Sequence, residues 1–155
     1  MTQSEKIAFK TRLKQIGVEL LQRRITTAAT AMSRAQEAAN AEEKSSSGDK
    51  CETGRAMGQL EREMYGRQSA EYERELKALQ AVAVDVVCAR AGAGALVQVK
   101  GMAIFMCAGL GKQQVDGQTV LFVSPKAPLA QALQGKKPGD DVMINAVKMM
   151  IEDLY

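Results

Sequence analysis

The sequence predicts an α+β protein, with an N-terminal antiparallel coiled-coil hairpin followed by a small, mostly antiparallel β domain that contains one short helix. Three observations support this prediction. Apolar residues recur at helical spacings through the first half of the chain, a polar segment from Ser45 to Arg55 interrupts them, and short apolar runs replace them after Ala95. We therefore expect a hairpin over residues 1–85, with its acidic tip at 45–55, and a β domain over residues 86–155.

The first helix is predicted from apolar residues at spacings of four and three, the pattern of a long amphipathic helix that packs on another helix. These residues are Phe9, Leu13, Ile16, Leu20, Leu21, Ile25, Ala28, Met32, Ala35 and Ala39. No proline interrupts them. A helix of roughly 40 residues is about 60 Å long at a rise of about 1.5 Å per residue, which is more than a small globular core requires.

A second helix is predicted after the polar segment, whose serines and Gly48 break the helical pattern. Ser47, Asp49 and Thr53 each offer a side-chain oxygen that could cap the new helix. The apolar stripe of this helix is weaker and consists of Leu60, Met64, Tyr72, Leu76, Leu79, Ala83 and Val86. Two stripes of similar length around a short break are best satisfied by an antiparallel hairpin.

Three glycines, Gly54, Gly58 and Gly66, lie on one row of the second helix, where each costs roughly 0.5–1 kcal/mol relative to alanine. One interpretation is that these small residues let a partner surface or a nucleic-acid backbone come close. The other, which we favour, is that they are tolerated on the surface beside Arg55 and Arg62. Both interpretations predict limited rigidity near the tip.

Short apolar runs bounded by glycines predict the strands of the C-terminal domain. The predicted strands are Leu96–Val99, Ala103–Cys107, Thr119–Val123, Val142–Asn145 and Val147–Ile151. Asp116-Gly117 predicts a hairpin turn, and Ala127–Leu133 predicts a short helix followed by a C-cap glycine, Gly135. The segment from Ala81 to Ala95, rich in Ala, Val and Gly, is predicted to link the two domains.

The composition excludes several classes of function. The chain has no histidine, and Cys51, Cys88 and Cys107 lie far apart without CxxC spacing. This argues against a structural zinc site, a disulfide framework and any mechanism that needs an imidazole. No apolar run is long enough to span a membrane, and the charged N-terminus lacks the apolar core of a secretory signal, so we expect a cytoplasmic protein.

A basic run near the N-terminus is interpreted as a solvated helix face rather than a nucleic-acid site, because the net charge of the chain is only +3. Its residues are Lys6, Lys10, Arg12, Lys14, Arg23 and Arg24.

The segment from Ser124 to Val142 reads SPKAPLAQALQGKKPGDDV. It resembles the C-terminal signature of the bacterial Gre transcript-cleavage factors, S-P-x-S-P-L-[AG]-x-A-L-x-G-K-x-x-G-D-x-V. The tip matches as well, because Asp49 and Glu52 fall where the family places its two acidic tip residues. The resemblance covers nearly the whole chain, since Gre factors also begin with a coiled-coil hairpin and end with a small FKBP-like domain.

The resemblance implies a transcription elongation factor that is not itself an enzyme but activates the RNA-cleavage activity of bacterial RNA polymerase. The hairpin would enter the secondary channel of the polymerase, while the FKBP-like domain holds the rim. Asp49 and Glu52 would direct a second Mg²⁺, shared with the polymerase active site and bound only weakly outside the complex, so that the 3′ part of a backtracked transcript is hydrolysed.

Two arginines of the second helix, Arg55 and Arg62, are candidates for contact with the nascent RNA near its 3′ end, although the resemblance does not assign them this role. The residues assigned to polymerase docking are Pro128, Leu129, Leu133, Gly135 and Lys136. No tightly bound cofactor and no membrane contact are expected.

The tip departs from the family pattern after the second acid, where Thr53-Gly54-Arg55-Ala56 replaces a further acid and an aromatic residue. Arg55 could steady transcript phosphates, or it could pair with Glu52 three residues earlier and blunt the site. A second function therefore stays open, a polymerase-channel regulator without cleavage activity. A third is a coiled-coil adaptor unrelated to transcription.

Overall fold

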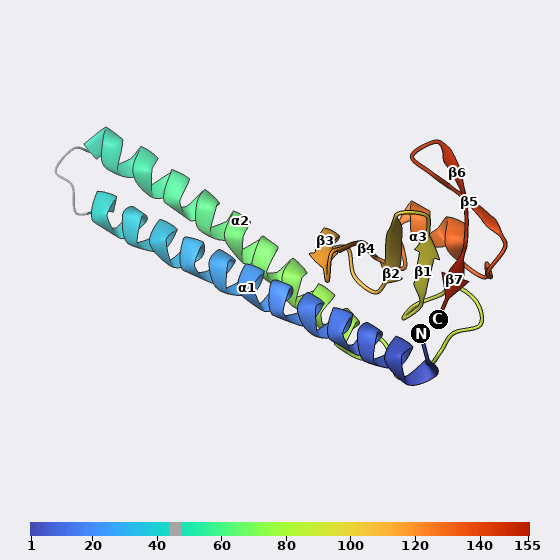
Figure 1. The fold of residues 1–155 in the computed structure, drawn as a ribbon. Helices are drawn as coiled ribbons and strands as arrows, with labels where there is room; N and C mark the ends of the chain where they lie inside the picture. The colour runs from blue at the N-terminus through green and yellow to red at the C-terminus, as the bar shows by residue number, and fades with distance from the viewer. Residues whose placement is uncertain (44–47) are drawn as a thin grey trace. The chain divides into compact units, whose positions relative to one another are not determined.

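The structure, a computed structural model, describes the backbone of residues 1–43 and 48–155 and the side chains of residues 1–41 and 53–155. Two long helices come first and a group of short strands follows (Figure 1). Within the described residues the elements are α1 (Gln3–Glu43), α2 (Gly48–Ala81), β1 (Leu96–Val99), β2 (Met102–Met106), β3 (Gly111–Val115), β4 (Gln118–Val123), α3 (Pro128–Leu133), β5 (Asp141–Ile144), β6 (Val147–Met150) and β7 (Asp153–Leu154). The mixed α+β class is thereby confirmed.

The chain divides into two compact units. Residues 19–76 form the first, which we call the hairpin unit, and residues 1–18 together with 77–155 form the second, which we call the β unit. Of the predicted break from Ser45 to Arg55, residues 45–47 lie outside the described residues, and the rest was predicted wrongly, because α2 already begins at Gly48 and includes Arg55.

In the hairpin unit α1 and α2 pack against each other in opposite directions. Gly58 of α2 lies against Ala39 of α1, and Gly66 lies near Met32. The guanidinium of Arg24 lies 6.0 Å from the centre of the Tyr72 ring, which is within cation–π range. On α1 the buried residues of the seam are Leu21, Ala28, Ala35 and Ala39, as the apolar spacing predicts.

The predicted stripe of α2 is wrong at four positions. Ala83 and Val86 are exposed and lie beyond the end of the helix, and Leu60 and Met64 lie within it. Leu60 and Met64 are 65% and 42% exposed, whereas Gly58 is buried and Tyr65 half-buried. Gly58, Tyr65, Tyr72 and Leu79 follow one another at intervals of seven residues, so they form the seam. Leu60 and Met64 lie to one side of this seam, because each residue advances by about 100° around the helix axis and neither residue falls on the seven-residue repeat.

The surface interpretation of the glycines is also wrong for Gly58. A methyl group built on Gly58 would lie 2.7 Å from the Cβ of Ala39 and 3.1 Å from the carbonyl oxygen of Ala35. Gly58 therefore lets the two helices approach each other closely, so its role is intramolecular packing.

The sheet of the β unit has the strand order β3-β4-β2-β1-β7. All neighbours pair antiparallel except β2 and β4, which pair in parallel with Ala103 opposite Val120 and Met106 opposite Val123. β5 and β6 form a separate antiparallel pair. The sheet is thus mostly antiparallel, as predicted, although β3 and β7 were not predicted as strands.

Both faces of the central strands are buried, which explains their nearly continuous apolar sequence. On one face Ile104 and Met106 join a core that also contains Leu133 of α3 and Ile144 of β5. On the other face Phe105 and Phe122 make an edge-to-face contact, with ring centres 5.7 Å apart. This second face packs on the helices of the β unit, since a Cβ on Gly17 would meet Leu79, Leu110 and Phe122.

The turns and the short helix of the β unit agree with the sequence predictions. Asp116 and Gly117 both have positive φ, as the hairpin turn between β3 and β4 requires. α3 starts at Pro128 and is followed by Gly135 with φ +79°. Asn145 and Ala146 also have positive φ, in the turn between β5 and β6.

The basic run of α1 is only partly the solvated face that was predicted, since Arg12 and Arg23 are exposed but Lys10 is not. Lys10 is fully buried, and its Nζ donates hydrogen bonds to the carbonyl oxygens of Val86 (2.7 Å) and Gly94 (2.9 Å). One turn later, Lys14 donates to the carbonyl oxygens of Gln80 (2.9 Å) and Val82 (2.7 Å). Two lysines one turn apart thus satisfy carbonyl groups at the end of α2 and in the segment that follows it.

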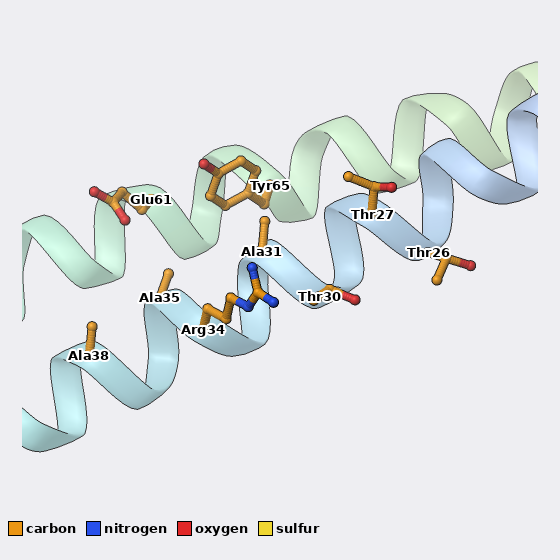
Figure 2. A pocket seen from close by; sticks show the side chains of 9 residues that line it. All are labelled: Thr26, Thr27, Thr30, Ala31, Arg34, Ala35, Ala38, Glu61 and Tyr65. Carbon is orange, nitrogen blue, oxygen red and sulfur yellow. The ribbon is translucent and has the colours of Figure 1, made fainter.

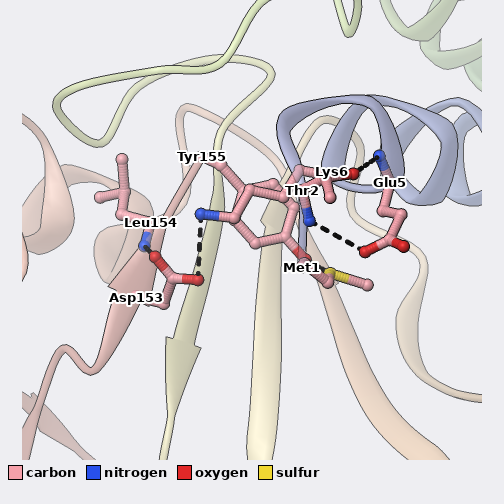
Figure 3. A network of polar contacts seen from close by, with 7 residues as sticks. All are labelled: Met1, Thr2, Glu5, Lys6, Asp153, Leu154 and Tyr155. Atoms are coloured by element: carbon pink, nitrogen blue, oxygen red, sulfur yellow. Dashed lines mark hydrogen bonds and ion pairs between the residues drawn. The ribbon is translucent and has the colours of Figure 1, made fainter.

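The N-terminus of α1 lies beside the C-terminal strand (Figure 3). Thr2 and Glu5 form a capping box, in which each side chain accepts a hydrogen bond from the backbone N–H of the other. Lys6 forms an ion pair with Asp153 (3.4 Å) and lies over the ring of Tyr155. The backbone of Tyr155 pairs with Leu96 in both directions, which fixes the end of the chain on β1.

Candidate functional site

The acidic tip falls at the start of α2, which begins at Gly48. Asp49 and Glu52 are three positions apart in its first turns, and their side chains lie outside the described residues. Arg55 and Arg62 follow on the same helix and are exposed. Seven residues separate them, so they lie on one face of α2, about 10 Å apart along the axis.

The acids of the tip fit Mg²⁺ by their chemistry. Mg²⁺ prefers oxygen ligands and usually binds through one or two carboxylates, with waters and phosphates completing the octahedron. Asp49 and Glu52 supply two carboxylates and no softer donor. Among the residues whose side chains are described, no group of three or more His, Cys, Asp or Glu could hold a metal ion.

The residues of the signature segment separate into a buried and an accessible group. Leu133 is fully buried in the core, so its side chain cannot contact a partner directly. The backbone N–H of Gly135 donates to Ala91, and the carbonyl of Lys136 accepts from the same residue. These contacts hold the turn after α3 against the segment that precedes β1. Pro128 is exposed and Leu129 half-buried, so these two remain available for docking.

Pro128 and Leu129 line a groove of about 310 Å³ on the β unit. The groove also involves Met102 of β2, Leu121 of β4 and Met143 of β5. Met143 is 58% exposed at its rim. The lining is mostly apolar, with Lys112 and Asn145 as its polar members. Such a groove suits an apolar segment of a partner protein, but the sequence alone did not reveal it because its residues come from five elements.

A second hollow, of about 470 Å³, lies on the hairpin unit between α1 and α2. Figure 2 shows threonines and Arg34 from α1 on one side, with Glu61 and Tyr65 from α2 on the other. Ala31, Ala35 and Ala38 leave space between the helices at this point. The threonines interrupt the apolar pattern of α1, and this was the signal in the sequence that could have indicated the hollow.

An apolar stripe is exposed on α2 close to the tip. It consists of Met57 (58% exposed), Leu60 (65%) and Met64 (42%). Residues separated by three, four and seven positions share one side of a helix, so the three side chains form a continuous strip. None of the three contributes to the helix seam, and the strip is therefore a surface that a partner can cover.

Comparison with protein-family models, with curated proteins and with solved structures found no match to this chain. In the part of the chain that the structure describes, no helix has both the length and the apolar character needed to cross a membrane.

Proposed function

We propose that this chain is a Gre-like transcription elongation factor, which binds bacterial RNA polymerase and stimulates Mg²⁺-dependent cleavage of backtracked transcripts. The hairpin would enter the secondary channel, with Asp49 and Glu52 at its leading end. In this role the chain activates the polymerase and has no independent enzymatic activity. It would act in the cytoplasm, together with its partner.

The observation that carries this proposal is the signature segment from Ser124 to Val142 in its structural context. The segment contains α3, the Gly135 turn and the start of β5, in a β unit whose sequence follows two long antiparallel helices. A two-helix hairpin with acids at its turn, joined to a small β domain that carries this motif, is the arrangement that the Gre resemblance implies. We accordingly propose a coiled-coil hairpin and an FKBP-like C-terminal domain.

The chemistry of the tip supports assistance to another active site rather than independent catalysis. Two carboxylates alone bind Mg²⁺ weakly, because waters and phosphates must supply the remaining ligands. In a backtracked complex the polymerase and the RNA would supply them. The metal would then polarise the scissile phosphate and lower the pKa of a bound water. Arg55 and Arg62, on one face of α2, would contact the phosphates of the transcript.

Docking would use the groove of the β unit. Pro128, Leu129 and Met143 present apolar surface there, and Lys136 stands next to the turn after α3. Leu133 and Gly135 would act indirectly, the first through the core and the second through the shape of the turn. This divides the five docking residues into those that contact the partner and those that shape the contact surface.

The first experiment measures RNA cleavage in stalled, backtracked elongation complexes, with and without this protein and with Mg²⁺ present. In the Asp49→Asn/Glu52→Gln variant the stimulated cleavage rate should fall at least a hundredfold, because removing one electrostatic contact to a transition state commonly slows a reaction by about this factor. The variant should still co-purify with core polymerase. Both substitutions keep the size and shape of the side chains and remove only their charges, so the comparison isolates the effect of the two carboxylates.

The matched control is Glu63→Gln, an exposed acid further along α2. Cleavage by this variant should equal that of the wild type. If neither the wild type nor the variants shorten the transcript, although all of them bind polymerase, the cleavage function is refuted and the regulatory alternative remains.

Docking is tested separately with two methionines of the β5–β6 pair. Met143 lines the groove, whereas Met150 is similarly exposed at 54% but lies outside it. Met143→Asp should weaken polymerase binding at least tenfold, because burying an unpaired charge is unfavourable. Met150→Asp should leave binding unchanged. Equal effects of the two variants would argue against the groove.

Two observations favour alternative functions. The Thr53-Gly54-Arg55 sequence after the second acid favours a channel regulator that docks without supporting cleavage. The exposed strip of Met57, Leu60 and Met64 favours, less strongly, an adaptor unrelated to transcription. An adaptor would not co-purify with polymerase, and this distinguishes it from both other functions.

A further inference from the structure

A buried amine lies next to a thiol in the β unit. The Nζ of Lys10 is 3.9 Å from the Sγ of Cys88, and it is held at the same time by the carbonyl oxygens of Val86 and Gly94. Lys10 comes from α1 and is fully buried, whereas Cys88 lies in the segment between α2 and β1 and is half-buried. The two carbonyls fix the amine in position beside the sulfur.

The surroundings of the pair favour reaction at nitrogen and at sulfur. Burial lowers the pKa of Lys10 below its ordinary value, although the nearby Cys88 and Asp85 oppose this shift. A lysine with a lowered pKa has a larger fraction of nucleophilic neutral amine at neutral pH. Cys88 is half-buried, so small oxidants such as hydrogen peroxide can reach its sulfur.

The second described cysteine lacks these features. Cys107 is buried in β-unit packing, and desolvation raises the pKa of its thiol to about 12. A thiol of this kind is almost entirely protonated at neutral pH and reacts slowly with peroxide. Of the two described cysteines, only Cys88 therefore combines accessibility with a neighbouring amine.

We propose that Lys10 and Cys88 form a reversible, oxidation-dependent covalent cross-link between α1 and the segment that precedes β1. Hydrogen peroxide first oxidises the thiol of Cys88 by two electrons: an S–O bond forms, the O–O and S–H bonds break, and the thiol proton leaves with the released hydroxide as one water, giving a sulfenic acid. The Lys10 amine then attacks the sulfur. An S–N bond forms, the S–O bond breaks, and the hydroxyl leaves as water with one amine proton, giving a sulfenamide.

The product remains compatible with its surroundings. The sulfenamide nitrogen keeps one N–H, which can still donate to the carbonyl oxygen of Val86 or of Gly94. The bond closes a chain segment in which the two residues are 78 positions apart. Such a link restricts the unfolded chain, so it stabilises the folded β unit. A thiol reductant attacks the sulfur and restores the amine and the free cysteine. The proposal is independent of the polymerase function.

The test is peptide mapping of the full chain by mass spectrometry after treatment with hydrogen peroxide. A Cys51→Ser/Cys107→Ser variant leaves Cys88 as the sole thiol, so an intramolecular disulfide cannot form. Trypsin should then release the peptides 7–12 and 78–90 joined to each other, with Lys10 uncleaved. Their combined mass should be about 2 Da below the sum of the free peptides, because the two condensation steps remove two hydrogens overall.

Dithiothreitol should restore both peptides and normal cleavage after Lys10. The midpoint of thermal unfolding should rise on oxidation and return after reduction. The matched control is Cys88→Ser, which should give neither the joined peptides nor the shift. The proposal is overturned if Cys88 gains one to three oxygen atoms or forms intermolecular disulfides while Lys10 is cleaved normally.

Discussion

The Nζ of Lys10 donates a 2.9 Å hydrogen bond to the carbonyl oxygen of Gly94, and both groups are buried although 84 residues separate them in the chain. The same nitrogen binds the carbonyl oxygen of Val86. A single side chain of α1 therefore satisfies two carbonyls of a segment that has no regular secondary structure. The buried lysine compensates there for the missing strand or helix partners.

Replacing Lys10 with methionine should destabilise the protein by about 2–4 kcal/mol, because two buried carbonyls lose their donor. Methionine keeps most of the side-chain volume, so the cavity contribution is small. The free energy of unfolding in urea measures the effect. Lys77→Met, at an exposed position of α2, is the control and should change stability by less than about 0.5 kcal/mol. Equal values for both variants would contradict a structural role of Lys10.

The contribution of Lys10 to stability should increase with pH. Burial lowers its pKa below the ordinary value of 10.5, so between the two values the unfolded chain binds more protons than the folded one. The free energy of unfolding then rises with pH across that window. The quantity to measure is the difference between wild type and Lys10→Met as the pH is raised towards 10.5, with Cys88→Ser in both chains so that the neighbouring thiol does not titrate. A constant or decreasing difference would refute the prediction.

Gly94 should tolerate alanine far less well than Gly101. Both have positive φ, +87° and +85°, but a Cβ on Gly94 would lie 2.3 Å from the carbonyl oxygen of Ala83, whereas a Cβ on Gly101 meets nothing within 4 Å. Gly101→Ala should cost about 1 kcal/mol from backbone conformation alone. Gly94→Ala should cost above ~3 kcal/mol, because the clash adds to this strain. Thermal or urea unfolding of both variants tests the difference.

Two leucines of α2 should behave differently, although both belong to its predicted apolar stripe. Leu79 is fully buried, so Leu79→Ala should destabilise the protein by about 2–5 kcal/mol. Leu60 is largely exposed, and Leu60→Ala should change stability by less than about 0.5 kcal/mol. A large loss for Leu60→Ala in urea unfolding would mean that the helix seam runs along the originally predicted stripe.

Ala146→Gly should stabilise the protein by about 1 kcal/mol, because alanine is strained in the left-handed conformation that a type I′ turn requires. Ala146 has φ +65° in the β5–β6 turn. The opposite sign is expected for Ala29→Gly, at an exposed position inside α1, which should cost about 0.5–1 kcal/mol. Destabilisation by both glycines in thermal unfolding would show that the turn conformation differs.

Local patterns in the sequence were sufficient for most elements of the fold. The apolar spacing of α1 and the glycine-bounded runs at β1, β2 and β4 depend on short-range periodicity. The three strands appear within a residue of their predicted ends, and α1 extends beyond its predicted stripe on both sides. β3 and β7 escaped prediction because they are polar or very short and exist through pairing with distant strands. The stripe of α2 was predicted through Leu60 and Met64 because they are apolar, but Gly58 and Tyr65 occupy the seam in their place.

The burial of Lys10 and its hydrogen bonds could not be predicted from the sequence. Nothing in the basic run distinguishes a buried lysine from solvated ones, because its partners are carbonyl groups of a remote segment. The candidate tip, in contrast, was found from a motif and a resemblance alone. The groove of the β unit needed the structure, since α3, β2, β3, β4 and β5 each contribute only one or a few of its residues.

The seam of the hairpin unit near Ala39 and Gly58 brings the helices close together, but it buries few carbon atoms. Apolar burial contributes about 25 cal/mol per Å², so alanine and glycine hold this end much less firmly than leucines would. We expect its amide hydrogens to exchange fastest within the unit, through local separation of the two helices. The end of the hairpin unit that carries the start of α2 should therefore open and close more readily than the rest of the unit.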